Sequence, residues 1–399
     1  MGIIVQKYGG SSVGSPDKIK NVADFIIKKK NEGNKVVVVV SAMGDTTDHL
    51  LNLADKISEN PDKRELDALL STGEMMSSAL LAMALKDKGC DSVSYNAFQI
   101  GMKSTEHHGR ALIVDIEEKI VLKSLNEGKV VIVCGFQGVF DDGSITTLGR
   151  GGSDTTALAL ACKLNGECEI YTDVTGIYTV DPRVYKNAKK LDYIDYEEIL
   201  ELSSLGAQVM HSRSIEIGQK YGIPIYVGLS CSDVKGTIIK ETENMNIEEK
   251  PITGLATSDS DLSVTISNLP QDFNLISALF GNIADRKINV DMICKSTSVL
   301  GNTELSFTVP KADLEEIKGI IGKYTSKKNI SIDEDITKFS AVGIGMKTTS
   351  GVAAKIFKIF SQNGVEIKMI TTSEIRITIA IKRKDKEKAV KLVAEEFNL

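Results

Sequence analysis

The run Val36–Val40 is the feature that most restricts what this chain can fold into. Five consecutive valines show no polar alternation, which is the pattern of a strand buried on both faces of its sheet. Val130–Cys134 repeats the pattern. Such strands belong to parallel sheets covered by helices on both sides, so an α/β architecture is expected.

Amphipathic stretches alternate with strand-like runs up to about residue 240. Ser15 and Pro16 predict a helix start, since Ser caps well and Pro costs nothing in the first turn. Other segments follow the same alternation, with strands predicted at Ile3–Lys7, Glu169–Thr172 and Ile223–Val227 and helices at Leu66–Leu85, Ala157–Leu164 and Ala207–Tyr221. Residues 1–240 therefore predict a mostly parallel sheet with helices on both faces.

Length and composition exclude several classes of protein. A chain of 399 residues predicts two or three domains. The chain has 48 basic and 54 acidic side chains, a net charge of −6 and no long basic block, so neither a nucleic-acid nor a membrane partner is expected. No apolar run approaches the roughly 20 residues of a membrane span, and MGIIVQKYGG does not resemble a signal peptide. Six scattered cysteines without a C-x-x-C pair favour reduced thiols and a cytoplasmic protein.

The last 150 residues have a different organisation. Residues 241–251 are polar, charged and closed by proline, and are predicted to be a linker. Residues 252–399 contain two similar units, at about 262–335 and at about 336–399 with an added strand from 252–257. Each unit has a strand, a helix and a strand, at Leu262–Ile266, Leu275–Arg286 and Ile288–Ile293 and at Ser340–Ile344, Val352–Asn363 and Val365–Ile370. Two copies are too few for a solenoid, so paired α+β modules are expected.

Three glycine-rich loops follow predicted strands and are the candidate chemical site. They span 7–12, 135–138 and 146–156. Glycine lets backbone N–H groups approach an anion, and the third loop runs into a helix whose N-terminus carries partial positive charge. Lys7 and Arg150 add cations, and Asp154 could orient Lys7 or Mg²⁺. No P-loop, dinucleotide-binding or protein-kinase motif is present, so phosphate chemistry of another family is indicated.

Five long motifs carry a family resemblance. KYGGSSVGS, SAMGDTTDHLL, LLSTGEMMSSALL, TTLGRGGSDTTA and YTDVTGIYTVDPR resemble the aspartokinases of the amino-acid kinase family, and the two tail units resemble their paired ACT domains. The resemblance implies a three-layer αβα amino-acid kinase domain followed by two α+β, ferredoxin-like ACT domains. It also implies phosphoryl transfer from ATP with Mg²⁺ to the β-carboxylate of L-aspartate, the first step of lysine, threonine and methionine biosynthesis.

The resemblance further implies regulation and assembly. An inhibitory amino acid would bind the ACT domains, with lysine as the first expectation and threonine as the second, and the protein would be a homodimer or a dimer of dimers through those domains. The implied effector residues are Asn289, Asp291, Met346, Ser350, Gly351 and Val352.

The resemblance assigns the site residues by position. The implied catalytic residues are Lys7, Arg150 and Asp154. The implied substrate-binding residues are Ser41, Thr47, Glu74, Arg150, Gly151, Gly152 and Ser153. The implied ATP-binding residues are Lys7, Tyr8, Gly9, Gly10, Ser11, Thr172, Asp173, Tyr178, Asp181 and Arg183. Arg150 suits a bidentate grip on the α-carboxylate and Glu74 suits the α-ammonium, while an acceptor that is already ionised needs no general base.

Alternatives remain for the residues and for the function. Lys7 could be a solvated strand end, Glu74 a surface residue, and Asp181 only part of a turn with Pro182. Met75 and Met76 are expected to fill a core. Gln208 stands where many relatives have a lysine that binds nucleotide. The rival functions are a glutamate or acetylglutamate kinase and an amino-acid sensor with an inactive kinase domain.

Overall fold

The computed structural model describes residues 2–206, 210–241, 250–297 and 303–399. The chain forms two compact units. Unit 1 comprises Met1–Ile177, Lys190–Leu200 and Gln208–Glu243, and unit 2 comprises Tyr178–Lys189, Glu201–Ala207 and Asn244–Leu399. A single boundary near residue 240 does not describe this division, because residues 178–189 and 201–206 belong to the same unit as the C-terminal part of the chain. Residues 242–249 of the predicted linker lie outside the described residues.

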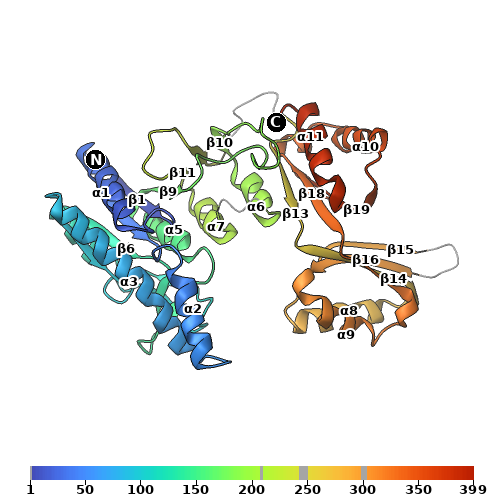
Figure 1. Ribbon diagram of the computed structural model, residues 1–399, viewed down its shortest axis with the longest axis horizontal. Helices are drawn as coiled ribbons and strands as arrows, with labels where there is room; N and C mark the ends of the chain where they lie inside the picture. Colours follow the sequence, from blue (N-terminus) through green and yellow to red (C-terminus); the bar gives the residue numbers. More distant parts are fainter. Residues whose placement is uncertain (1, 207–209, 242–249, 298–302) are drawn as a thin grey trace. The chain divides into compact units, whose positions relative to one another are not determined.

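Unit 1 is built on an eight-stranded sheet with the order β10-β12-β11-β9-β1-β2-β6-β3 (Figure 1). All neighbouring strands are parallel except β11 and β12, which confirms the mostly parallel sheet. The strands are β1 (Ile3–Tyr8), β2 (Lys35–Val40), β3 (Ser92–Tyr95), β6 (Val130–Cys134), β9 (Glu167–Thr172), β10 (Tyr193–Ile194), β11 (Ile225–Leu229) and β12 (Thr237–Ile239).

Helices cover the valine-rich strands. They are α1 (Pro16–Asn31), α2 (Thr46–Ile57), α3 (Lys63–Asp87), α4 (Lys119–Asn126), α5 (Gly152–Leu164), α6 (Tyr196–Ser204) and α7 (Ser212–Tyr221). Val36, Val38 and Val40 pack into one core with side chains of α1 and α3. Val37 and Val39, which strand alternation turns to the other face, are equally buried. The Ser15 hydroxyl accepts the amide of Lys18, as the predicted helix start requires.

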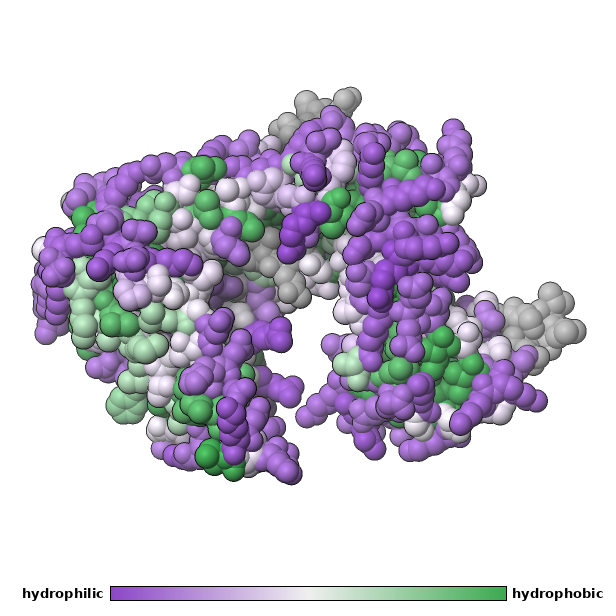
Figure 2. Space-filling model, in the orientation of Figure 1, coloured by the Kyte–Doolittle hydropathy of each residue, from purple (hydrophilic) through white to green (hydrophobic). Residues whose placement is uncertain are grey.

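Helix α3 buries polar residues and exposes apolar ones. Its buried polar residues are Asp67, Ser71, Glu74, Ser77 and Ser78. Met75 and Met76 are 42% and 43% exposed, so the expectation that they fill the core is wrong. Figure 2 shows apolar surface over this helix. Among the described residues α3 is the one helix long and apolar enough to cross a membrane, yet half of its most apolar window is buried, as in ordinary core helices.

A small second sheet with the order β5-β4-β7-β8 was not expected from the sequence. Its strands are β4 (Lys103–Ser104), β5 (Ile113–Asp115), β7 (Gln137–Val139) and β8 (Ile145–Thr147). The second glycine-rich loop therefore runs directly into β7, and the third one starts inside β8. The last strand of this sheet, β8, ends three residues before Arg150.

Unit 2 contains two modules with the same spatial arrangement of strands. The first has β14 (Asp261–Leu269), α8 (Phe273–Asp285), β15 (Asp291–Thr297), β16 (Thr303–Pro310), α9 (Leu314–Ile321) and β17 (Ile330–Asp333), with the sheet order β15-β16-β14-β17. The second has β18 (Ile336–Val342), α10 (Val352–Gln362), β19 (Ile367–Thr372), β20 (Arg376–Lys382) and α11 (Lys386–Glu396). Both are ferredoxin-like α+β modules, as expected.

The second module takes its fourth strand from far upstream. Strand β13 (Gly254–Ser258) pairs antiparallel with β18, so the sheet order is β13-β18-β20-β19. The first module therefore lies, in sequence, between two neighbouring strands of the second. Short 3₁₀ helices complete the unit at η1 (Lys311–Asp313), η2 (Lys327–Asn329), η3 (Ile344–Lys347) and η4 (Arg383–Asp385).

Several predicted elements have different boundaries in the structure, including α7, β18 and β15. The helix expected from residue 207 begins at Ser212, with His211 extended at its N-cap, and residues 207–209 lie outside the described part of the chain. Strand β18 ends at Val342, before Gly343, because the chain turns there against the backbone of Ile252 and Thr253. Strand β15 starts three residues later than predicted, after the chain reverses at Lys287 with φ +60°.

Candidate functional site

The carboxyl ends of three adjacent parallel strands, β1, β2 and β6, meet at one edge of the large sheet. Ligands of open α/β sheets bind at this edge. Hydrogen bonds tie the three following loops together: the Ser41 amide donates to the Tyr8 carbonyl at 3.1 Å and the Gly135 amide to the Val40 carbonyl at 3.0 Å. The sheet therefore brings the loops after β1, β2 and β6 into one place.

Lys7 and Asp154 form an ion pair at this edge. The Lys7 ammonium lies 2.6 Å from the Asp154 Oδ1 atom, and both side chains are almost buried, at 13% and 12% exposure. Asp154 comes from the first turn of α5, where the helix dipole favours a carboxylate. The Oδ1 atom has no hydrogen-bond partner in the described structure, so the ion pair with Lys7 is its polar contact there.

The loop after β1 brings backbone close to Lys7. A Cβ on Gly9 would lie 3.5 Å from the Lys7 ammonium, so the cation extends over bare backbone. A Cβ on Gly10 would come within 2.7 Å of the Ala42 carbonyl oxygen, so only glycine fits there. Ser11 is exposed, and its carbonyl accepts the ammonium of Lys18 at 2.9 Å.

Tyr8 does not have the surface position expected of a nucleotide-binding side chain. Its ring is fully buried and stacks on Tyr171 with centroids 5.1 Å apart. Its hydroxyl donates to the Gln6 Oε1 atom at 3.2 Å, and burial raises its pKa far above the usual value. The strand alternation turns this residue inward, so only its backbone reaches the candidate site.

Glu74 is a buried carboxylate beside the loop after β2. It is only 3% exposed, which contradicts its interpretation as a surface residue. The Ala42 amide donates to its Oε1 atom at 3.0 Å, whereas its buried Oε2 atom has no hydrogen-bond partner in the described structure. Burial raises the pKa of the Glu74 carboxyl to about 7, and the Ala42 hydrogen bond only partly opposes this shift. Among the described residues the Glu74 carboxylate thus has no cationic partner.

Helix α3, which carries Glu74, also contacts the loop after β2, where predicted substrate-binding residues lie. The Ser77 hydroxyl donates to the Ser41 carbonyl at 2.8 Å. Thr47, in the first turn of α2, is half-buried. A Cβ on Gly73 would lie 2.8 Å from the Ala42 Cβ atom, so α3 packs directly on this loop.

Arg150 lies in a loop that its glycine neighbours shape. Gly149 and Gly151 have φ values of +76° and +68°, which side chains other than glycine rarely adopt. Arg150 is exposed, and its guanidinium has no polar partner within the described ranges. Ser153 follows in α5 and touches Gly135, where a Cβ would lie 2.6 Å from the Ser153 hydroxyl oxygen. Gly152 is similarly packed against Phe136.

The predicted ATP-binding residues divide between the two units. Thr172 and Asp173, at the end of β9, belong to unit 1, and their side chains hydrogen-bond each other at 2.9 Å. Tyr178, Asp181 and Arg183 belong to unit 2. The Arg183 guanidinium donates to both carboxylate oxygens of Asp181, which lowers the Asp181 pKa. The Asp181 carboxylate also accepts the Arg183 amide, so the turn interpretation holds as well.

One predicted effector residue takes part in an ionic cluster between the two modules of unit 2. The buried Lys338 ammonium lies 3.0 Å from carboxylate oxygens of both Asp261 and Asp291. Burial raises the pKa of Asp291, but the hydrogen bond and charge of Lys338 outweigh it and lower the pKa overall. The remaining predicted effector residues are the exposed Asn289, Ser350 and Gly351, the half-buried Met346 and the buried Val352.

Two residues near the site were missed at the sequence level. Asp67 is 2% exposed and lies on the same buried face of α3 as Glu74. The seven-residue spacing of two carboxylates in a largely apolar helix was the available signal. Arg213 of α7 donates to the Leu148 and Ala111 carbonyls, at 2.9 and 3.0 Å, and nothing in the sequence pattern indicated that role.

Comparisons with known proteins agree with this architecture. A family model of the amino acid kinase family matches residues 2–228, and a model of an ACT domain matches residues 339–397. The chain therefore belongs to the amino acid kinase family and carries ACT modules.

Full-length relatives narrow the family. The aspartokinase of Bacillus sp. (strain MGA3) is 46% identical over all of this chain and 98% of its own length. The crystal structure of E. coli aspartokinase III in complex with aspartate and ADP matches with a TM-score of 0.81 and 25% identity over the whole of both chains. The structure of the same enzyme with lysine and aspartate matches with a TM-score of 0.80 and 26% identity, covering 99% of each chain. The protein belongs to the aspartokinases.

Proposed function

We propose that the protein transfers the γ-phosphoryl group of ATP to the β-carboxylate of L-aspartate, giving 4-phospho-L-aspartate and ADP. The relatives at 41–46% identity are aspartokinases, and the similar E. coli enzyme was crystallised with aspartate and ADP. The observation in this chain that carries the proposal is the unpaired Oε2 atom of buried Glu74. A buried carboxylate without a cation matches a substrate that brings its own ammonium group.

This observation also separates aspartate from a rival substrate. Acetylglutamate has no free ammonium group, so it would leave the Glu74 carboxylate unpaired. Arg150 lies exposed in the loop before α5. In this proposal its guanidinium binds the α-carboxylate through two hydrogen bonds. Glu74 and Arg150 together select a free α-amino acid.

The reaction brings two anions together, so the task of the protein is positioning and charge neutralisation. In this proposal the Lys7 ammonium neutralises charge on the transferring phosphoryl group, and Asp154 holds the ammonium in place through the 2.6 Å ion pair. The bare backbone of Gly9, next to the Lys7 ammonium, lets phosphate oxygens approach Lys7. The β-carboxylate attacks phosphorus, the bond to the bridging oxygen of ADP breaks, and no proton is transferred.

Mg²⁺ fits this site as a companion of ATP. Within the described ranges no group of three or more His, Cys, Asp or Glu side chains could hold a metal ion. Mg²⁺ commonly binds through substrate phosphates and one or two carboxylates, which is compatible with a site that contains Asp154 and Asp173. When bound it supplies neutralisation of the phosphate charge. Thr172, Asp173, Tyr178, Asp181 and Arg183 would hold the nucleotide.

Regulation and assembly complete the proposal. An amino acid, lysine first and threonine second, binds near Asp291 and inhibits the enzyme, and the ACT modules join chains into a homodimer or a dimer of dimers. Support comes from the E. coli relative, which was crystallised with lysine. Light scattering with and without lysine tests the assembly, and a monomer under both conditions contradicts it.

Trapping of the acyl phosphate with hydroxylamine tests the reaction itself. The protein is incubated with ATP, Mg²⁺ and either aspartate, glutamate or acetylglutamate, and the hydroxamate is measured. Hydroxamate from aspartate alone is expected. A stronger signal from acetylglutamate, or none from any acid, contradicts the proposal.

A further inference from the structure

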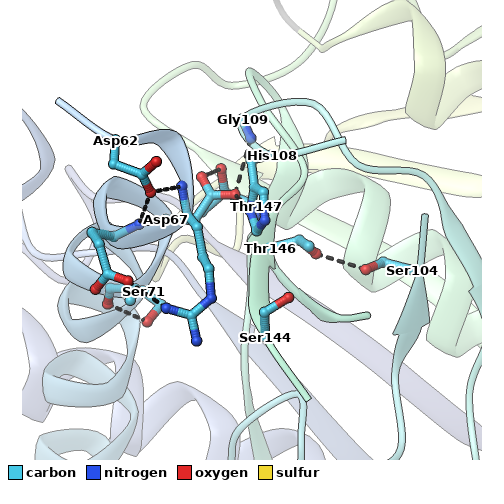
Figure 3. Close-up of polar contacts among 12 residues, drawn as sticks. Asp62, Asp67, Ser71, Ser104, His108, Gly109, Ser144, Thr146 and Thr147 are labelled. Carbon is cyan, nitrogen blue, oxygen red and sulfur yellow. Dashed lines mark hydrogen bonds and ion pairs between the residues drawn. The ribbon is translucent and has the colours of Figure 1, made fainter. Parts of the chain in front are cut away.

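Asp67 is a carboxylate inside unit 1 that accepts four hydrogen bonds. Its Oδ2 atom accepts the His108 ring nitrogen Nδ1 at 2.8 Å, the Gly109 amide at 3.0 Å and the Thr147 amide at 3.0 Å. Its Oδ1 atom accepts the Thr147 hydroxyl at 2.5 Å. Figure 3 shows these groups converging on Asp67 from separate segments. At 2% exposure the carboxylate cannot touch a substrate in solution.

The partners of Asp67 are the two supports of the Arg150 loop. Thr147 ends β8, three residues before Arg150. Gly109 packs against Gly149, where a Cβ would lie 3.0 Å from the Gly109 carbonyl oxygen. The Ala111 amide also donates to the Thr147 carbonyl at 2.9 Å, which joins both supports directly. Asp67 therefore holds both Thr147, which precedes the Arg150 loop, and Gly109, against whose backbone Gly149 packs.

Helix α3, which carries Asp67, also carries Glu74, the residue proposed to bind the substrate ammonium group. Glu74 follows Asp67 by seven residues, about two turns or 10 Å along α3. Glu74 faces the loop after β2, while Asp67 holds the loop that presents Arg150. One rigid helix thereby sets the separation between an anion for the ammonium group and a cation for the carboxylate.

We propose that Asp67 is a positioning residue for the amino-acid substrate, which holds the Arg150 loop at a fixed distance from Glu74 through Thr147, His108 and Gly109. The inference rests on the proposed roles of Glu74 and Arg150. An uncharged side chain at position 67 would not replace Asp67, because all four groups around it are hydrogen-bond donors. Only a carboxylate can accept from all of them. A small displacement of a binding group is costly to catalysis. Because Arg150 is proposed to bind aspartate, loss of the Asp67 contacts should weaken the binding of aspartate and leave the binding of ATP unchanged.

Steady-state kinetics of the full-length Asp67→Asn variant test this role. The amide keeps the side-chain volume but turns an N–H₂ group toward N–H donors. We expect the KM for aspartate to rise about tenfold or more, as for loss of hydrogen bonds to a charged group, and the KM for ATP to stay within about twofold. Asp62→Ala is the matched control: Asp62 caps the same helix, accepting the amides of Arg64 and Glu65, but does not contact the loop. It should leave both KM values unchanged.

A pair of variants at Thr147 keeps the test decisive should Asp67→Asn fail to fold. Thr147→Val removes the hydroxyl donor in an equal volume, and Thr147→Ser restores it. The KM for aspartate should rise several-fold in the first and return close to normal in the second. An unchanged KM for aspartate in Asp67→Asn or Thr147→Val, or a parallel rise for ATP, overturns the inference. Failure of the proposed function looks different, because then the wild-type protein forms no hydroxamate from aspartate.

Discussion

The Lys7 ammonium lies 2.6 Å from the Asp154 carboxylate, at the point where the central strand of the large sheet ends and α5 begins. The pair joins the loop after β1 to the helix after the third glycine-rich loop. Both side chains are nearly buried, so the pair is screened little by solvent.

Replacing Lys7 by Ala should lower kcat by about 10²–10³-fold, the usual loss for one electrostatic stabiliser of the transition state. Coupled-assay turnover with saturating aspartate and ATP measures this. Lys29→Ala is the control, because Lys29 pairs with Glu169 at 3.2 Å elsewhere in unit 1. Near-normal turnover of the Lys7 variant would remove Lys7 from the mechanism.

Replacing Arg150 by Lys should raise the KM for aspartate about tenfold, with a smaller change in kcat. A lysine keeps the charge but loses the second parallel hydrogen bond to the carboxylate. Initial rates at varied aspartate and fixed ATP give the answer. If the KM for ATP rises instead, Arg150 contacts the nucleotide and its assignment to aspartate is wrong.

Aspartate binding should depend on pH through Glu74. Its pKa of about 7 means that the free protein holds a proton there in mildly acidic solution, and the substrate ammonium must displace that proton. The value of kcat/KM for aspartate should rise about tenfold per pH unit up to about pH 7 and then level off. In Glu74→Gln the profile should be flat and lower throughout. A wild-type profile already flat from pH 5.5 upward would contradict a buried, unpaired carboxylate.

Glu74 should also affect the stability of the substrate-free protein. Its pKa is about 7 when folded and about 4.5 when unfolded, so between these values only the folded state holds the proton. The folded state is therefore favoured at low pH, and the free energy of unfolding falls as pH rises through this range. Above pH 7 the free energy of unfolding should be about 3 kcal/mol lower than it is below pH 4.5. Urea unfolding of wild-type and Glu74→Gln protein should diverge across this interval in favour of the variant.

Inhibition should depend on Asp291. In the present structure its carboxylate contacts the Lys338 ammonium, so an effector ammonium would compete with a side chain already in place. Asp291→Asn should weaken lysine inhibition by about tenfold or more and leave the uninhibited rate unchanged. Asp333→Asn is the comparison, since Asp333 also pairs across the modules, with Lys368 at 3.6 Å. Equal inhibition of both variants would place the effector elsewhere.

Most of the fold could be predicted because its strands carry strong patterns. The fully buried strands β2 and β6 have unbroken apolar runs, and β6 matches its predicted bounds. The small sheet of β4, β5, β7 and β8 escaped detection because its strands have two or three residues, too few to show a period. The start of α7 was placed too early since the apolar period continues through Met210, which lies outside the helix.

The site was predictable where it depended on local motifs and not where it depended on packing. Lys7 and Asp154 were expected to meet because each lies in a glycine-rich loop after a strand, and they do. The burial of the Tyr8 ring was not predicted, because a motif position does not say which face of β1 a side chain takes. Burial of Glu74 and Asp67 was not predicted, since in α3 these two carboxylates are buried while Met75 and Met76 are exposed, opposite to the usual rule.

Because β13 pairs with β18, the first module of unit 2 is an insertion between two neighbouring strands of the second module. Ser258 faces Lys338 across the two strands, so only Ile336 and Thr337 would separate these positions if residues 259–335 were excised. Two residues are the length of a tight hairpin turn, for which Asn-Gly is preferred. Excision of residues 259–335 would therefore remove the first module and keep all four strands of the second, whereas a chain that began at Ile336 would leave the second module without its outer strand β13.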